Sequence, residues 1–196
     1  MKTAVAESAY ARDIAYQCHH DWFAEAGYIQ PNVTGRYTDH FTDRSVYFLV
    51  YEGHLCREHV IGMVRVVTRA PFRTLEEFTL YDEFQYLYSE PGIMESSALC
   101  WHPQSAMQAI PHLYRAIFQF GFENGYQHII CNLDVRVLAV SQRKLKLPFR
   151  QCGYEQEYMG SLKAPVHLSR CLEMPLLPQV SPLMWDIMSQ PLDPPV

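Results

Sequence analysis

Two charged residues interrupt apolar segments of the sequence. Glu95 lies in Ile93–Trp101, which we expect to be a strand at the centre of a sheet, and Arg65 lies in another apolar strand. A charge at such a position is costly unless it is paired or faces a cleft. Glu95 could form a salt bridge, for instance to Arg65, or act as a general base whose pKa is raised by burial. Asp39 and Asp43, in the polar loop before the first apolar strand, could instead supply the carboxylate for Arg65.

A predicted hairpin turn contains three potential metal ligands, His54, Cys56 and His59. They could bind zinc, but three ligands without a second cluster of ligands are weak evidence for a zinc site. We therefore favour their interpretation as polar turn residues. His19 and His20 are adjacent in a predicted helix, point to different faces and cannot easily share a metal. The motifs of phosphate-binding loops, nucleophile elbows and HExxH metalloenzymes are absent. We therefore expect no bound metal.

Hydrophobic periodicity predicts the elements that must position these residues. Helices are expected at residues 10–26, 107–124 and 136–147, with a short one beginning at residue 74, and strands at 46–51, 60–68, 93–101, 128–134, 154–159 and 166–171. Pro111 suits the first turn of a helix, so the second helix should start near Ile110. Helices between strands imply parallel crossovers, whereas the first two strands form a hairpin. The order predicts a mixed sheet with helices on its faces.

The length of the chain favours a single domain. It has 196 residues, of which 48% are hydrophobic, enough for one sizeable core. The last twenty-two residues hold six of the thirteen prolines and no glycine. We therefore expect one domain over residues 1–174, followed by an extended proline-rich tail over 175–196.

Charge and composition exclude several classes of protein. The net charge of −5 argues against a nucleic-acid coat protein, because affinity for nucleic acid comes largely from neutralised phosphates. No apolar run is long enough to cross a membrane, and the first residues lack a secretion signal. The six cysteines contain no C-x-x-C pair and are expected to be reduced thiols. These features predict a cytoplasmic protein.

Five segments resemble, in their order and spacing, motifs of the Gcn5-related N-acyltransferase (GNAT) superfamily. They are Trp22–Tyr28 (F-x-x-x-x-G-W), Asp39–Asp43 (D-x-[FY]-D), Gly62–Pro71 with the following Leu75 and Phe78 (G-x-x-R-L-x-x-T-x-x-P…L…F), Glu95–Cys100 (E-[SV]-S-R-[FL]-x-V) and Phe149–Tyr154 (G-[FY]). The chain resembles in particular the branch of acyl-homoserine-lactone synthases and long-chain N-acyl amino acid synthases, over residues 10–171. This resemblance implies an α/β (α+β) fold with a mostly antiparallel central sheet, a splayed parallel strand pair and helices on both faces.

The resemblance also implies an activity. It is that of an N-acyltransferase, which moves an acyl group, expected to be a fatty acyl group, from a thioester to the amine of an amino acid or similar small molecule. Glu95 would take the proton of the amine, directly or through water. The residues expected to bind the acceptor are Arg65, Asp39 and Trp22, and those whose backbone N–H groups would polarise the thioester carbonyl are Leu99, Cys100 and Trp101.

The sequence departs from the family pattern at several positions. Cys18 and Ala98 stand where family members carry arginines, and the second loop aspartate falls at Thr42. The amine acceptor can therefore differ from that of the family. The glycine-rich loop that grips the pyrophosphate of coenzyme A is also missing from the segment before the third expected helix. Acyl-carrier protein therefore joins acyl-CoA as a candidate donor, in either case as a co-substrate and not as a bound cofactor.

A basic stretch near the end of the domain could dock such a donor. Residues 135–154 contain no acidic residue and five basic ones, Arg136, Arg143, Lys144, Lys146 and Arg150. These could steer an acidic carrier protein or form an ordinary solvated helix face, and we weigh the two interpretations equally. Two alternatives to fatty acyl transfer also stay open. One is an acetyl-CoA-dependent acetyltransferase, and the other is a non-catalytic protein of the same fold that binds a ligand or a partner.

Overall fold

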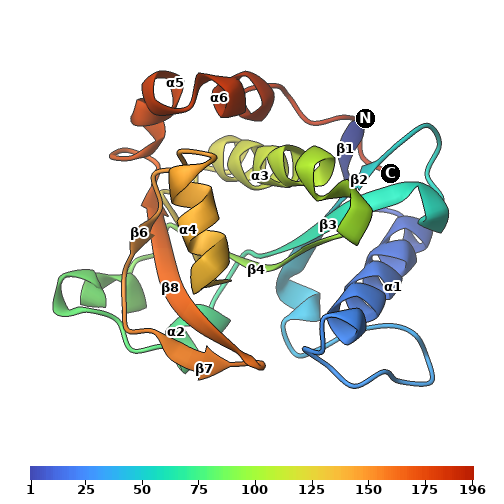
Figure 1. Ribbon diagram of the computed structural model, residues 1–196, viewed down its shortest axis with the longest axis horizontal. Helices are drawn as coiled ribbons and strands as arrows, with labels where there is room; N and C mark the ends of the chain where they lie inside the picture. The colour runs from blue at the N-terminus through green and yellow to red at the C-terminus, as the bar shows by residue number, and fades with distance from the viewer.

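The computed structural model describes residues 1–196 and contains one sheet covered by helices (Figure 1). The strands are β1 (Lys2–Val5), β2 (Ser45–Tyr51), β3 (Val60–Val67), β4 (Ile93–Trp101), β5 (His128–Asp134), β6 (Arg150–Gln151), β7 (Gln156–Tyr158) and β8 (Ser161–Ser169). The helices are α1 (Ala9–Glu25), α2 (Arg73–Glu77), α3 (Ala106–Glu123), α4 (Val135–Arg143), α5 (Leu177–Val180) and α6 (Pro182–Met188). No helix is both long and apolar enough to cross a membrane.

The sheet has the order β1-β2-β3-β4-β5-β8-β6, with β7 pairing to β8. Every neighbouring pair is antiparallel except β4 and β5, which are parallel and are connected through α3. Helices α3, α4 and α6 cover one face, and α1 and α2 lie on the other. The predicted fold class, a mixed and mostly antiparallel sheet with one parallel pair and helices on both faces, is confirmed.

The parallel pair separates soon after it begins. Only three positions are paired, and the last joins Glu95 to Ile130. Beyond this point β4 continues to Trp101 along β3, while β5 continues to Asp134 along β8. The edges of β4 and β5 that face each other there carry backbone groups without a strand partner, and a V-shaped opening results. This opening is the splay that the resemblance implied.

Alternation along β3 sends its side chains to opposite faces of the sheet. Val64 and Val66 pack in the core beneath α3 and α4, whereas Met63 packs beneath α1. Each fully buried apolar side chain of this size contributes about 1.5–3 kcal/mol to folding. Arg65 lies on the same face as Met63 and is completely buried there. The apolar pattern of the strand therefore forces one guanidinium into the interior.

A β-bulge in β4 decides which residues share the face of Arg65. Arg65 lies opposite Ala98, but the residue after Arg65 lies opposite Ser96, so Ser97 is an extra residue in β4. Regular alternation from Ala98 would turn Glu95 toward α3. The extra residue reverses the alternation, so Glu95 faces the same side of the sheet as Arg65.

Several boundaries differ from the expected ones. Helix α3 begins at Ala106 and contains Pro111 in its second turn, whereas we expected a start near Ile110. The basic helix ends at Arg143 and not at 147, the strand expected at 154–159 is the shorter β7, and the strand expected at 166–171 is β8, which begins at 161. Strand β1 was not expected, because four residues are too few for a periodic pattern.

Residues 175–196 form helices where we expected an extended tail. Pro178 and Pro182 stand within the first two positions of α5 and α6, where a helix does not need the N–H that proline lacks. Three apolar side chains of this segment are buried against α3, namely Leu177, Met184 and Met188. The last residues are extended, and the N–H of Val196 donates to the carbonyl of Val5 at 2.9 Å, so the two termini lie side by side (Figure 1).

Candidate active site

The opening between β4 and β5 leads into a cavity, called the polar cavity below. Strand β4 lines it with Ser97 and Leu99, and the side chains that other elements contribute include those of His19 from α1, Arg73 from α2 and Lys163 from β8. Polar and charged groups from four elements that are distant in sequence therefore converge at the point where the parallel strands separate.

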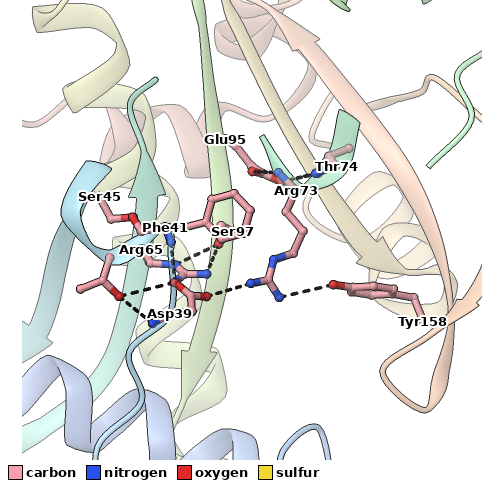
Figure 2. Close-up of polar contacts among 10 residues, drawn as sticks. Asp39, Phe41, Ser45, Arg65, Arg73, Thr74, Glu95, Ser97 and Tyr158 are labelled. Atoms are coloured by element: carbon pink, nitrogen blue, oxygen red, sulfur yellow. Dashed lines mark hydrogen bonds and ion pairs between the residues drawn. The ribbon is translucent and has the colours of Figure 1, made fainter. Parts of the chain in front are cut away.

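Asp39 bridges two arginines at this cavity (Figure 2). The Nη1 of Arg65 donates to Oδ1 of Asp39 at 2.8 Å, and the Nη2 of Arg73 donates to Oδ2 at 2.8 Å. The Nε of Arg65 donates to Oγ of Ser97, the bulge residue, at 2.9 Å. Burial alone would raise the pKa of the Asp39 carboxyl, but the charges and hydrogen bonds of the arginines outweigh it and hold the pKa below its usual value.

The partner of Arg65 is therefore Asp39, and neither Glu95 nor Asp43 forms an ion pair with Arg65. We expect Asp39→Asn to lower the free energy of unfolding by about 1.5–3 kcal/mol at neutral pH, because the hydrogen bonds would lose their charge. Because the pKa of Asp39 is depressed in the folded state, its ionised carboxylate stabilises the fold at pH values above the ordinary carboxyl pKa. This stabilisation is lost as the pH falls through the depressed pKa.

Urea unfolding of the wild type and of Asp39→Asn, from neutral to acidic pH, measures this effect. The two stabilities should converge as the pH falls, whereas a constant difference would contradict the assignment. Asp43→Asn is the matched control, because Asp43 lies in the same loop, is exposed and forms no ion pair.

Glu95 is completely buried and contacts the first turn of α2. Its Oε2 accepts a hydrogen bond from the N–H of Arg73 at 2.8 Å, and its Oε1 accepts from the N–H of Thr74 at 2.7 Å and from the Thr74 hydroxyl (Figure 2). Burial raises the pKa of Glu95, although these hydrogen bonds lower it in part. Glu95 does not line the polar cavity. Its role as general base stays a prediction, and its visible contacts hold Arg73 in place.

His19 is a residue of the polar cavity that the sequence analysis did not select. Both of its ring nitrogens are buried without a hydrogen-bond partner, and its ring packs between Phe23 and Tyr37. Burial keeps the pKa of His19 well below its usual value, so the imidazole is neutral. The available sequence signal was its position next to Cys18, where the family carries an arginine.

Trp22 lies outside the polar cavity. It lines a neighbouring surface cavity with Cys100, Trp101 and Pro103, of which Trp101 also lines the polar cavity, and Arg57 lies over the ring of Trp22 at 5.2 Å. The expected acceptor residues Arg65 and Asp39 therefore come together, whereas Trp22 stands apart from them. Its role in acceptor binding stays a prediction.

The backbone of β4 supplies N–H groups to the opening. The N–H of His102 donates to the carbonyl of Ile61 at 2.9 Å, and alternate residues of an antiparallel strand bond to the same neighbour. The N–H of Cys100 therefore points to β3, whereas those of Leu99 and Trp101 point away from β3 toward the opening. Of the three expected oxyanion donors, Leu99 and Trp101 have the orientation that the role requires.

An apolar groove lies on the other side of Leu99, between α3 and α4. It is lined by Leu99 and Trp101 of β4, by apolar side chains of the two helices such as Ile110 and Val140, and by Leu145 just beyond α4. Leu99 lines both the groove and the polar cavity. A polar compartment and an apolar one therefore adjoin at a strand edge with free N–H groups.

The sequence profile of the family "N-acyl amino acid synthase FeeM" matches residues 14–171. The chain belongs to this family. No curated protein sequence matches it. Among solved structures, the CoA-dependent acyl-homoserine lactone synthase BjaI, with SAM and isopentyl-CoA, is 18% identical with a TM-score of 0.70 over 98% of this chain and 93% of that chain.

Two further structures share the fold of this FeeM-family protein. TofI, in a ternary complex with an inhibitor and MTA, is 16% identical with a TM-score of 0.66 over 98% of both chains. FeeM itself, from uncultured soil microbes, is 13% identical with a TM-score of 0.60 over 86% of this chain and 95% of that chain.

Two further cations reach the polar cavity of this FeeM-family member, whose chain has Cys18 and Ala98 where the resemblance implies arginines. Arg73 reaches the polar cavity from α2, and Lys163 lies there buried from β8 with its Nζ over the ring of Tyr28 at 4.5 Å. Sequence reasoning did not select either residue, because each comes from an element whose place beside the cavity depends on the tertiary fold.

The five basic residues expected to dock a donor are all exposed. Arg136 is paired with Asp134 at 3.1 Å, and Arg150 is paired with Glu173 at 3.6 Å. The other three, Arg143, Lys144 and Lys146, form no ion pair and lie at the end of α4 and just beyond it, beside the apolar groove. The basic surface of this FeeM-family protein is therefore narrower than the sequence suggested.

Proposed function

We propose that this protein is an N-acyl amino acid synthase that transfers a fatty acyl group from a phosphopantetheine thioester to the amino group of an amino acid. The observation that carries the proposal is the meeting of a cationic polar cavity and an apolar groove at Leu99. The neutral amine nitrogen bonds to the thioester carbonyl carbon, the carbon–sulfur bond breaks, and the proton lost by the nitrogen ends on the released thiol.

The charges of the polar cavity favour an anionic acceptor. Arg65 and Arg73 share the single carboxylate of Asp39, which leaves one positive charge in excess. The Nε of Arg73 is buried without a hydrogen-bond partner, and the charge of Lys163 offsets that of Asp134, the acid that also lines the cavity. The carboxylate of an amino acid would satisfy such donors and hold the adjacent amine in one position.

The donor would approach from the opposite side of Leu99. An acyl chain fits the apolar groove between α3 and α4, because its burial there removes apolar surface from water. The thioester carbonyl would lie at the edge of β4, where the N–H groups of Leu99 and Trp101 stabilise the oxyanion as the amine attacks. Arg143, Lys144 and Lys146, beside the groove, would attract an acidic acyl-carrier protein or the phosphates of acyl-CoA, and the missing glycine-rich loop favours the carrier protein.

His19 is the group we propose to remove the proton from the amine. It is neutral and lines the polar cavity with unpartnered nitrogens, so one of them can accept a proton from the tetrahedral intermediate. Glu95 contacts the backbone of α2 and not the cavity, so we propose that it positions Arg73.

The proposal is tested by assaying the purified protein with acyl chains from acetyl to palmitoyl, each on coenzyme A and on acyl-carrier protein. Acceptors are amino acids and the amines that result from their decarboxylation. We expect N-acyl amino acids from long-chain donors and little product from the decarboxylated amines. Preference for acetyl-CoA would instead indicate an acetyltransferase, and an absence of turnover with a retained acyl ligand would indicate a binding protein.

Arg73→Met tests the acceptor half of this proposal. It should lower kcat/KM for amino acids about 10–100-fold, mainly through KM, because a charge-assisted contact to the carboxylate is lost. The decarboxylated amines should not be affected in this way. Arg69→Met is the matched control, because Arg69 is exposed and lies outside the polar cavity.

A further inference from the structure

The turn between β2 and β3 gathers three metal-ligating side chains outside the acyl-transfer site. One ligand atom each of His54, Cys56 and His59 lies within 4.8 Å of the other two. The sequence alone favoured an interpretation as polar turn residues, because their spacing does not reveal whether the side chains converge. Gly53 begins the turn with a φ of +67°, and the N–H of Glu52 donates to the carbonyl of His59 at 3.1 Å, which closes the turn.

A hydrogen bond prepares one of the imidazoles for a metal. The Nδ1 of His59 lies 3.0 Å from the backbone carbonyl of His54. A carbonyl only accepts, so Nδ1 carries the hydrogen and Nε2 keeps its lone pair. Metal-ligating histidines usually make this contact from the nitrogen that does not bind the metal, because it fixes the tautomer and the ring orientation.

We propose that His54, Cys56 and His59 form a zinc site. A thiolate with two imidazoles is a donor set that suits Zn²⁺ better than Mg²⁺ or Ca²⁺, which prefer oxygen ligands. Ligand atoms around tetrahedral zinc are separated by about 3.5 Å, given bonds of about 2.0–2.3 Å. The three side chains therefore need only a small inward movement from their present separation, and water completes the coordination.

The position of the site suggests what the metal does. Arg57, within the same turn, donates to Asp21 at 2.9 Å and lies over the ring of Trp22, both on α1. Zinc bound by His54, Cys56 and His59 links the two ends of this turn, which holds Arg57 against α1. The ion therefore stabilises the packing of the β2–β3 hairpin against the last turns of α1.

The test uses Co²⁺ as a spectroscopic probe of the purified protein. One equivalent should produce the thiolate-to-cobalt charge-transfer band and the visible bands of a tetrahedral complex, and one equivalent of Zn²⁺ should abolish them. Cys56→Ser should lose the charge-transfer band, and His59→Asn should weaken Co²⁺ binding at least about 100-fold, since loss of even an outer-shell partner costs about 10–100-fold. Cys171→Ser is the matched control, because Cys171 is an exposed thiol far along the chain.

Thermal unfolding gives a second readout. Zn²⁺ should raise the unfolding temperature of the wild type and of Cys171→Ser but not that of Cys56→Ser, because a ligand that binds only the folded state stabilises it. Circular dichroism without metal verifies that each variant is folded. The proposal is overturned if Co²⁺ gives no charge-transfer band, if the band persists in Cys56→Ser, or if Zn²⁺ stabilises that variant as much as the wild type.

Discussion

Glu95→Gln is expected to lower the free energy of unfolding by about 3 kcal/mol. The carboxylate accepts hydrogen bonds from the N–H groups of Arg73 and Thr74 through different oxygens, in a completely buried position. An amide offers only one oxygen, so its NH₂ group would face one of these donors, and an unsatisfied buried group costs about 1–3 kcal/mol or more where a charge is lost. Urea unfolding measures the difference. Glu76→Gln is the control. Glu76 is an exposed residue of α2, so this variant should change the free energy of unfolding by less than about 0.5 kcal/mol.

The same variant separates two roles for Glu95. If Glu95 is the general base, Glu95→Gln should lower turnover about 10²-fold or more even under conditions in which the variant is fully folded. If Glu95 only positions Arg73, Glu95→Gln should raise KM for the amino acid. Thr74→Val, which removes a hydroxyl bonded to the same carboxylate, should then reproduce part of this rise in KM and part of the destabilisation. If Thr74→Val keeps full turnover and only Glu95→Gln loses kcat, Glu95 is the base, and our assignment of Glu95 as a positioning residue is contradicted.

His19→Phe is expected to lower turnover about 10²–10⁴-fold while leaving stability unchanged or raising it. The phenyl ring keeps the packing against Phe23 and Tyr37, and two buried nitrogens without partners are removed. Since burial lowers the pKa of His19, the wild type also loses stability as the pH falls through the ordinary histidine range, and the variant lacks this loss. Steady-state kinetics and urea unfolding at two pH values measure these effects.

His20→Phe is the matched control for that experiment, and it should show the opposite pattern. The Nε2 of His20 accepts a hydrogen bond from the N–H of Asn32 at 3.0 Å, and its Nδ1 contacts Asp21 at 3.0 Å. The variant should therefore be less stable but retain turnover, because His20 does not line the polar cavity. Similar turnover in His19→Phe and wild type would remove His19 from the mechanism.

Most of the fold could be predicted because strong hydrophobic patterns mark its long elements. Helix α1 and strands β2 to β5 lie close to their expected ranges. The elements that were missed are held by tertiary contacts instead. Strand β1 has only four residues, and the short helices α5 and α6 are stabilised by three side chains buried against α3, where proline content alone suggested an extended chain.

The candidate site was predictable in part. A guanidinium in an apolar strand requires a carboxylate, and this physical rule led to Arg65 with Asp39 as one candidate partner. Residues that reach the cavity from distant elements carried no comparable signal. Arg73 and Lys163 are ordinary surface residue types, and His19 is identified only by the absence of partners around its ring.

By itself the sequence determined that buried charges at Arg65 and Glu95 had to be satisfied and that helices and strands alternate around them. Only the tertiary structure decided which groups satisfy each charge. The extra residue Ser97 reverses the alternation of β4 and turns Glu95 toward α2, while the loop before β2 brings Asp39 to Arg65. Strand register and bulges are set by contacts between distant segments, so a local pattern of residues can state the need for a partner but not its identity.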